Sequence, residues 1–168
     1  MELSRLLLLV LALTFAMALT LCHVSLAQNR PQDFLDLHNA AREEVGVRRP
    51  LTWDPSLEEY AKKYAEVRSN DCQLIHSGGP YGENIYWGYG TDGYTDAEGA
   101  IKYWVDEKKY YNYESNSCMR GKECLHYTQI VWSNSVHLGC ARTKCTNDHF
   151  FITCNYNPPG NFEGERPY

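Results

Sequence analysis

Three features are missing from this sequence, and each absence narrows the range of functions. The chain has no basic stripe, since its 16 Lys and Arg are outnumbered by 21 Asp and Glu, for a net charge of −5. This argues against nucleic acid as a partner and against simple electrostatic attraction to anionic membranes. After residue 27 there is no run apolar enough to cross a membrane, and there are no internal repeats or low-complexity linkers. We therefore expect residues 28–168 to form one domain that does not span a membrane.

Residues 1–27 are typical of a signal peptide. Arg5 gives a positive start, residues 6–21 are almost all apolar, and the triplet at 25–27 (Ser-Leu-Ala) offers small residues for cleavage after Ala27. The alternative is an uncleaved anchor, because the apolar run nears the ~18–20 residues that span a bilayer. The small-residue triplet, and the absence of a basic cluster after the run, favour cleavage. We therefore expect a secreted, extracellular protein.

The cysteine pattern lacks the C-x-x-C pairs of zinc knuckles, so a structural zinc site is disfavoured. One of the seven cysteines, Cys22, lies in the signal peptide. An even number remains, and in a secreted chain this implies disulfides. The remaining cysteines are Cys72, Cys118, Cys124, Cys140, Cys145 and Cys154. Six cysteines allow 15 connectivities, and spacing alone does not choose among them.

Hydrophobic periodicity predicts that the helices come early and the paired strands late. One helix is expected to start at Asp54-Pro55, where a capping side chain precedes a proline, and another at the capping box Thr95-x-x-Glu98. Because helices and strands segregate rather than alternate, the sequence predicts an α+β fold with an antiparallel sheet. The helices are expected at 31–45, 55–65, 95–108 and 124–132, the strands at 82–87, 138–144 and 150–156, a loop at 88–93 and a turn at 146–148.

Four residues could carry chemistry: His76, Glu83, Glu107 and His126. Two imidazoles and two carboxylates are plausible ligands for a divalent ion such as zinc, or groups for general acid–base work. No two of them have the helical spacing of an H-E-x-x-H motif. From the residues alone, a shared site and four separate local roles, such as capping or turn formation, both remain open.

Several long, ordered motifs resemble a known family. The runs at 126–132 (His-Tyr-Thr-Gln-Ile-Val-Trp) and 151–161 (Phe-Ile-Thr-Cys-Asn-Tyr-Asn-Pro-Pro-Gly-Asn) resemble the two signatures of the CAP superfamily. That superfamily comprises cysteine-rich secretory proteins, antigen 5 and pathogenesis-related 1 proteins. The segments at 72–84, 104–108 and 111–113 resemble its plant pathogenesis-related 1 branch in particular. The resemblance covers the whole chain after the signal peptide.

The resemblance implies a fold and a cleft. The fold would be a three-layer α-β-α sandwich with a mainly antiparallel central sheet and three disulfides, Cys72–Cys145, Cys118–Cys124 and Cys140–Cys154. The family's cleft residues match His76, Glu83, Glu107 and His126, which would form a structural or divalent-ion site with zinc as the favoured ion. No cofactor would be required.

The resemblance also implies a plant defence protein that is antimicrobial through binding microbial or plant sterols or other lipids. The matching ligand loop holds Tyr110, Tyr111, Tyr113 and Met119, whose aromatic rings could present a flat apolar surface to a sterol. The alternative is that these tyrosines pack on the domain. We expect a monomer that is not an enzyme. The weaker alternative is a metal-dependent or serine-type extracellular hydrolase, with Ser77 and Ser133 as candidate nucleophiles, although neither lies in a G-x-S-x-G elbow.

The last implication concerns residues 158–168, which resemble a released signalling peptide with its own receptor. Cleavage would fall between Asn157 and Pro158, and the family more often has Asp than Asn at the first of these positions. The segment is rich in Pro and Gly and lies beyond the last cysteine, as a releasable segment would. The alternative is an ordinary tail that docks on the domain.

Overall fold

The computed structural model describes residues 29–90, 95–146 and 148–168. The predicted signal peptide lies outside the described residues, as do 91–94 of the predicted loop and Asn147 of the predicted turn. The helices are α2 (Pro31–Glu43), α3 (Pro55–Arg68), α4 (Ala97–Val105), the 3-10 helix η1 (Asp106–Tyr110) and α5 (Leu125–Ile130). The strands are β1 (Thr52–Trp53), β2 (Gly82–Gly88), β3 (Tyr111–Asn112), β4 (Ser117–Cys118), β5 (His137–Lys144) and β6 (Phe150–Asn157).

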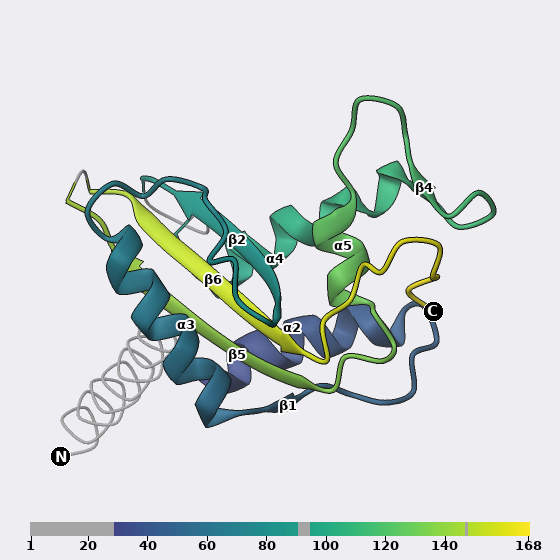
Figure 1. The fold of residues 1–168 in the computed structure, drawn as a ribbon, viewed down its shortest axis with the longest axis horizontal. Helices are drawn as coiled ribbons and strands as arrows, with labels where there is room; N and C mark the ends of the chain where they lie inside the picture. Colours follow the sequence, from purple (N-terminus) through teal and green to yellow (C-terminus); the bar gives the residue numbers. More distant parts are fainter. Residues whose placement is uncertain (1–28, 91–94, 147) are drawn as a thin grey trace, which may run out of the picture.

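The central sheet has the strand order β1-β5-β6-β2. Only the short pairing of β1 with β5 is parallel, while β5–β6 and β2–β6 are antiparallel. Helix α3 covers one face of the sheet, and α2 and α4 cover the other (Figure 1). The predicted α+β class, the three layers and the mainly antiparallel sheet are therefore confirmed.

Strand β6 shows how alternation separates the two faces of the sheet. Phe151 belongs to the core beneath α3, with Ala61 and Ala65, whereas the next residue, Ile152, belongs to the core beneath α2 and α4. Successive side chains of a strand point to opposite faces, so one strand supplies both cores. Six consecutive residues of β6 are buried, as expected for a strand covered on both sides.

The three disulfides are the pairs that the resemblance implies. Cys140 and Cys154 face each other directly across β5 and β6, with Cα atoms 4.1 Å apart. Cys72–Cys145 ties the segment after α3 to the end of β5, and Cys118–Cys124 closes the segment between β4 and α5. Closing such loops stabilises a fold by typically ~2–4 kcal/mol each.

The helix predicted for residues 95–108 differs from the observed one at both ends. The carboxylate of Asp96, and not the hydroxyl of Thr95, accepts a hydrogen bond from the Gly99 N–H at 2.9 Å, so α4 begins at Ala97. The capping box at Thr95 was therefore wrong, because Asp caps a helix at least as well as Thr and lies one residue further on. The chain also tightens into η1 at Asp106, and Glu107 lies in that turn.

A buried arginine that the sequence did not single out fixes the position of α5. Arg42 is 1 % exposed, and its guanidinium donates to the carbonyl oxygens of Ile130 at 3.0 Å and Trp132 at 2.7 Å. It also donates to the carbonyl oxygens of Arg49 and Ser135. Burial lowers the pKa of Arg42 to about 10. Because the carbonyl groups of Ile130, Trp132 and Ser135 lie at the end of α5 and in the turn after it, Arg42 holds that helix against α2.

Candidate functional site

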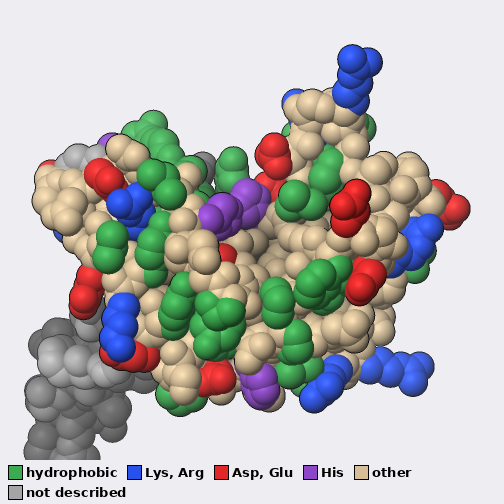
Figure 2. All heavy atoms as spheres, viewed as in Figure 1, with side chains coloured by type: hydrophobic (Ala, Val, Ile, Leu, Met, Phe, Trp, Pro, Cys, Tyr) green, Lys and Arg blue, Asp and Glu red, His purple; other side chains and the backbone are tan. Residues whose placement is uncertain are grey.

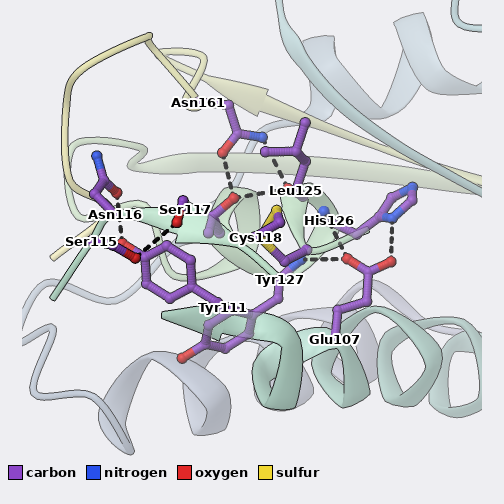
Figure 3. Close-up of a disulfide and its surroundings, with 12 residues drawn as sticks. Glu107, Tyr111, Ser115, Asn116, Ser117, Cys118, Leu125, His126, Tyr127 and Asn161 are labelled. Atoms are coloured by element: carbon purple, nitrogen blue, oxygen red, sulfur yellow. Dashed lines mark hydrogen bonds and ion pairs between the residues drawn. A yellow bond between two sulfur atoms is a disulfide. The ribbon is translucent and has the colours of Figure 1, made fainter. Parts of the chain in front are cut away.

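Glu107 and His126 form the first of two histidine–carboxylate pairs (Figure 3). The imidazole Nδ1 of His126 lies 2.7 Å from Glu107 Oε1. The other carboxylate oxygen, Oε2, accepts the main-chain N–H of His126 at 3.1 Å and that of Tyr127 at 3.4 Å. Both N–H groups lie in the first turn of α5, where no partner exists within the helix. Glu107 therefore orients the imidazole and also satisfies the start of the helix that carries it.

His76 and Glu83 form the second pair. His76 precedes β2, and its Nδ1 lies 2.8 Å from Oε1 of Glu83 in β2; the same oxygen accepts the Ser77 N–H. Burial acts to raise the pKa of Glu83, but the hydrogen bonds from His76 and Ser77 outweigh it, so that its pKa is lowered. The hydrogen bond to Glu83 raises the pKa of His76. Both shifts favour the charged forms of the two side chains.

The two imidazoles line one groove. Its volume is about 780 Å³, and most of its lining is aromatic or aliphatic. Figure 2 shows histidine side chains in a hollow of the face drawn there, with hydrophobic side chains around them. The residues that line the groove are Leu74, His76, Ile85, Tyr86, Trp87, Gly88, Tyr89, Gly90, Tyr103 and His126. A mostly apolar groove with a few polar groups is the usual form of a small-molecule site.

The sequence did not identify the aromatic wall of this groove. Trp87 stacks on Tyr89, with ring centroids 5.7 Å apart, and Tyr103 contacts Tyr86 at 5.5 Å. Trp87, Tyr89 and Tyr103 are all at least 39 % exposed. The period of two that places Trp87 on the same strand face as Ile85 was the available signal. It could not show that Tyr103, from α4, would contact Tyr86 and line the same groove.

A chain of buried polar groups connects the core to α5. The ring of His38 lies 2.7 Å from the Phe34 carbonyl oxygen and 2.8 Å from the Tyr156 hydroxyl. That hydroxyl accepts from Asn84 Nδ2, which also donates to the His126 carbonyl oxygen at 3.0 Å. Burial lowers the pKa of His38 to about 4, so this imidazole is neutral near neutral pH. His38 therefore serves the core, whereas His76 and His126 face the groove.

The two candidate serine nucleophiles lie in different settings. The Ser77 hydroxyl accepts from the Tyr60 hydroxyl at 3.0 Å and from the Gly79 N–H. Ser133 uses its main-chain N–H to bond the Pro167 carbonyl oxygen. Within the described part of the chain, neither hydroxyl is hydrogen-bonded to an imidazole, the contact that activates a serine nucleophile. The hydrolase alternative therefore gains no support from the serines.

The same pairs bear on the predicted zinc site. Across residues 29–90, 95–146 and 148–168, no group of three or more His, Cys, Asp or Glu side chains is arranged to hold a metal ion. The carboxylates of Glu83 and Glu107 already have hydrogen-bond partners, since each accepts main-chain or imidazole N–H groups. A metal-binding histidine is commonly oriented by a carboxylate at its other ring nitrogen, and this is how both histidines are held. In each pair the carboxylate therefore lies at Nδ1 of its histidine, which makes the imidazoles, rather than Glu83 and Glu107, the candidate ligands.

The predicted ligand loop lies apart from the groove, on the β3–β4 hairpin and the segment after it. Met119 is 56 % exposed, and the Tyr110 ring lies near the ammonium groups of Lys109 and Lys122. Tyr111 and Tyr113 instead contact Tyr168, and the Tyr113 ring stacks on it at 5.0 Å. In the loop, the Tyr113 ring is 43% exposed and stacks on Tyr168, whereas Trp87, Tyr89 and Tyr103 of the groove are 39%, 64% and 58% exposed.

Comparisons with known proteins agree with this fold. Residues 35–156 match the model of the family described as "CAP: Cysteine-rich secretory protein family". The chain is 57% identical over 156 residues to the basic form of pathogenesis-related protein 1 of Nicotiana tabacum, covering 93% of this chain and 84% of that protein. It is 51% identical over 158 residues to a pathogenesis-related protein of PR-1 type from Sambucus nigra, covering 94% of this chain and 93% of that protein.

A solved structure also shares the fold of this chain. The venom allergen-like protein 4 of Schistosoma mansoni superposes with a TM-score of 0.64 at 29% identity, covering 82% of this chain and 92% of that one. In the described part of the chain, no helix has the length and apolarity needed to cross a membrane. The chain belongs to the cysteine-rich secretory protein family, CAP, and within it resembles the plant pathogenesis-related 1 proteins.

Proposed function

We propose that this protein acts in plant defence outside the cell by binding a sterol or a related flat apolar ligand in the groove between His76 and His126. The observation that supports the proposal is the groove itself, with its volume of about 780 Å³ and its aromatic wall. Flat rings stack well on Trp and Tyr side chains, and the imidazoles could hydrogen-bond a polar end group. The names of the plant relatives support the defence role.

The test is the binding of a fluorescent sterol to the secreted protein, with competition by unlabelled ergosterol and phytosterol. The double variant Trp87→Ala with Tyr103→Ala removes the groove wall and should lose binding. The matched control is Tyr111→Ala with Tyr113→Ala, which alters the predicted ligand loop and should bind as the wild type does. Loss only in this control would move the ligand to the loop, and no saturable binding at micromolar protein would exclude sterol as the ligand.

A second role of the same site is zinc binding. We propose that one zinc ion is bound through the imidazoles of His76 and His126, because each is oriented by a carboxylate at Nδ1. Titration calorimetry with zinc chloride, on protein purified without chelators, should give one site that is lost in both His76→Ala and His126→Ala. A site of unchanged affinity in either variant would contradict this assignment.

A third role is that of a peptide precursor, with residues 158–168 as the released signal. Asn157 ends β6, the following Pro158 is exposed, and residues 161–166 are exposed as well. Mass spectrometry of fluid from the leaf cell-wall space after microbial challenge should detect the eleven-residue peptide. Only intact chains after challenge would contradict the release.

A further inference from the structure

Residues 158–168, here called the tail, do not extend freely from the domain. The tail leaves β6 and runs back past α5 (Figure 1). Its first half is bound by α5: the Gly160 N–H donates to Gln129 Oε1 at 3.0 Å, and the side-chain Oδ1 of Asn161 accepts from Thr128 Oγ1 at 2.7 Å. Asn161 also donates through Nδ2 to the Leu125 carbonyl oxygen at 2.9 Å, and its side chain points at this helix in Figure 3.

The second half of the tail is bound by the β3–β4 hairpin. Arg166 donates to the carbonyl oxygens of Tyr113 and Glu114, and its guanidinium lies 4.9 Å from the centre of the Tyr113 ring. The Tyr113 hydroxyl donates to the main-chain oxygen of Tyr168 at 2.8 Å. Pro167 is buried, and its carbonyl oxygen accepts from the Ser133 N–H at 2.7 Å.

The tail is held as a bound peptide is held, through its main chain and a few side-chain anchors. It forms no helix or strand. Its main-chain groups at Pro158, Gly160, Glu165, Pro167 and Tyr168 all bond to residues outside the tail. A hollow of about 200 Å³ remains between the tail and the hairpin, so this part of the tail crosses the domain surface without filling it. Main-chain bonds supply affinity in such binding, and anchors supply specificity.

One tail residue is selected by shape. A Cβ atom added at Gly160 would lie 2.6 Å from Cγ of Trp132 and 2.9 Å from Nε2 of Gln129. Trp132 is 2 % exposed and Gln129 is 1 % exposed, so neither side chain has room to move away. The surface between α5 and the β3–β4 hairpin therefore accepts glycine at this position and rejects a larger residue.

We propose that this surface is a peptide-binding groove whose ligand is a segment with the sequence of residues 158–168, occupied in the intact chain by its own tail. A tail cut at Asn157–Pro158 would then remain bound, and its release would be a second step. The retention of a cut tail rests on the proposed release of this peptide. The groove does not, because it is formed in the uncut chain.

The test uses the full-length chain, expressed with residues 1–27 and carrying Asn161→Ala, Arg166→Ala and Tyr168→Ala. These changes weaken the hold of the tethered tail and leave the groove residues unchanged. A fluorescent peptide with the wild-type sequence of 158–168 is titrated, and its anisotropy is measured. We expect saturable binding to the variant and at least about tenfold weaker binding to the wild type, where the tethered tail competes at an effective concentration on the order of millimolar.

Two further peptides provide the matched control. The Gly160→Ala peptide should bind the variant at least about tenfold more weakly, because of the clash with Trp132. The Glu163→Ala peptide should bind as the wild-type peptide does, because Glu163 is exposed. Equal binding of the wild-type peptide to variant and wild-type chains, or no saturable binding to a variant with native circular dichroism, would overturn the proposal.

A second measurement tests whether the tail is bound even if the triple variant does not fold. Carboxypeptidase should remove Tyr168 from the native wild-type chain at least about tenfold more slowly than from the free peptide, since the end of the tail is bound. Equal rates would overturn the proposal. Neither measurement involves cleavage at Asn157, so a plant that never releases the peptide would contradict the precursor role and leave the groove standing.

Discussion

The His76–Glu83 and His126–Glu107 pairs have the same chemistry and different supports. In each pair a histidine Nδ1 meets a carboxylate Oε1, at 2.8 Å in the first and 2.7 Å in the second. Both carboxylates are buried, but the His76 side chain is 59% exposed and that of His126 only 25%. The His126 ring also stacks on the Trp104 ring, with an angle of 11° between the two ring planes. The first pair thus joins a surface segment to a strand, and the second joins two packed helices.

The two pairs therefore have different roles in the molecule, although their chemistry is the same. Glu107 accepts two main-chain N–H groups of α5 in addition to its imidazole, so it is part of the fold. Glu83 holds the His76–Ser77 segment against β2, so it sets the geometry of the groove's edge. Changes to the His126–Glu107 pair should therefore affect the free energy of unfolding, and changes to the His76–Glu83 pair should affect the pKa of His76.

The largest expected effect is that of Glu107→Ala. Three donors lose their acceptor, and two of them are main-chain N–H groups at the start of α5. We expect the free energy of unfolding to fall by about 3 kcal/mol, measured by denaturant titration. Glu107→Gln keeps one side-chain oxygen as an acceptor and should lose less. A loss below about 1 kcal/mol for the alanine variant would remove the distinction between the pairs, since exposed pairs contribute that little.

An intermediate effect is expected on titration of His76. Because the hydrogen bond to Glu83 raises the pKa of His76, Glu83→Gln should lower that pKa toward or below its ordinary value of 6.5. Proton NMR of the His76 ring across pH reports this directly. An unchanged midpoint in the variant would show that the pair does not exist in solution.

The same pair should give a window of pH in which it stabilises the protein. The raised pKa of His76 contributes stability below its ordinary value of 6.5, which is lost as the pH rises through the folded pKa. The lowered pKa of Glu83 contributes stability above its ordinary value of 4.5, which is lost as the pH falls through the folded pKa. The difference in Tm between wild type and Glu83→Gln should therefore be greatest between 4.5 and 6.5. A difference that is flat from pH 4 to 8 would contradict the linkage.

The smallest expected effect is that of His76→Ala on stability. The side chain is mostly solvated and its pairing is screened, so we expect a loss of about 0.5 kcal/mol or less at neutral pH. The comparison variant is His126→Ala, which also removes the ring beside Trp104 and should cost more. Similar losses in the two variants would mean that the packing of His126 between the helices adds nothing to the free energy of unfolding.

Local patterns predicted most of the elements, but their ends depended on neighbours. Asp54 caps α3 as expected, because an Asp followed by Pro acts through local hydrogen bonds alone. The start of α4 was misplaced because two adjacent residues, Thr95 and Asp96, are both good caps. Burial of Arg42 could not be foreseen either, since its partners are carbonyl groups that lie about 90 positions along the chain. An arginine in an amphipathic helix ordinarily faces solvent.

The sequence by itself determined the class of fold and the presence of disulfides, because periodicity and the parity of the cysteines are properties of the chain alone. It named four candidate side chains, and only its motifs, through the family resemblance, implied that they share a cleft. Only the tertiary structure decided which histidine contacts which carboxylate and that both imidazoles line one aromatic groove. It alone also decided that residues 158–168 are bound along α5 and the β3–β4 hairpin. The physical reason is that these contacts join segments distant in sequence. Their geometry depends on how the helices and sheet pack, and no local pattern records that packing.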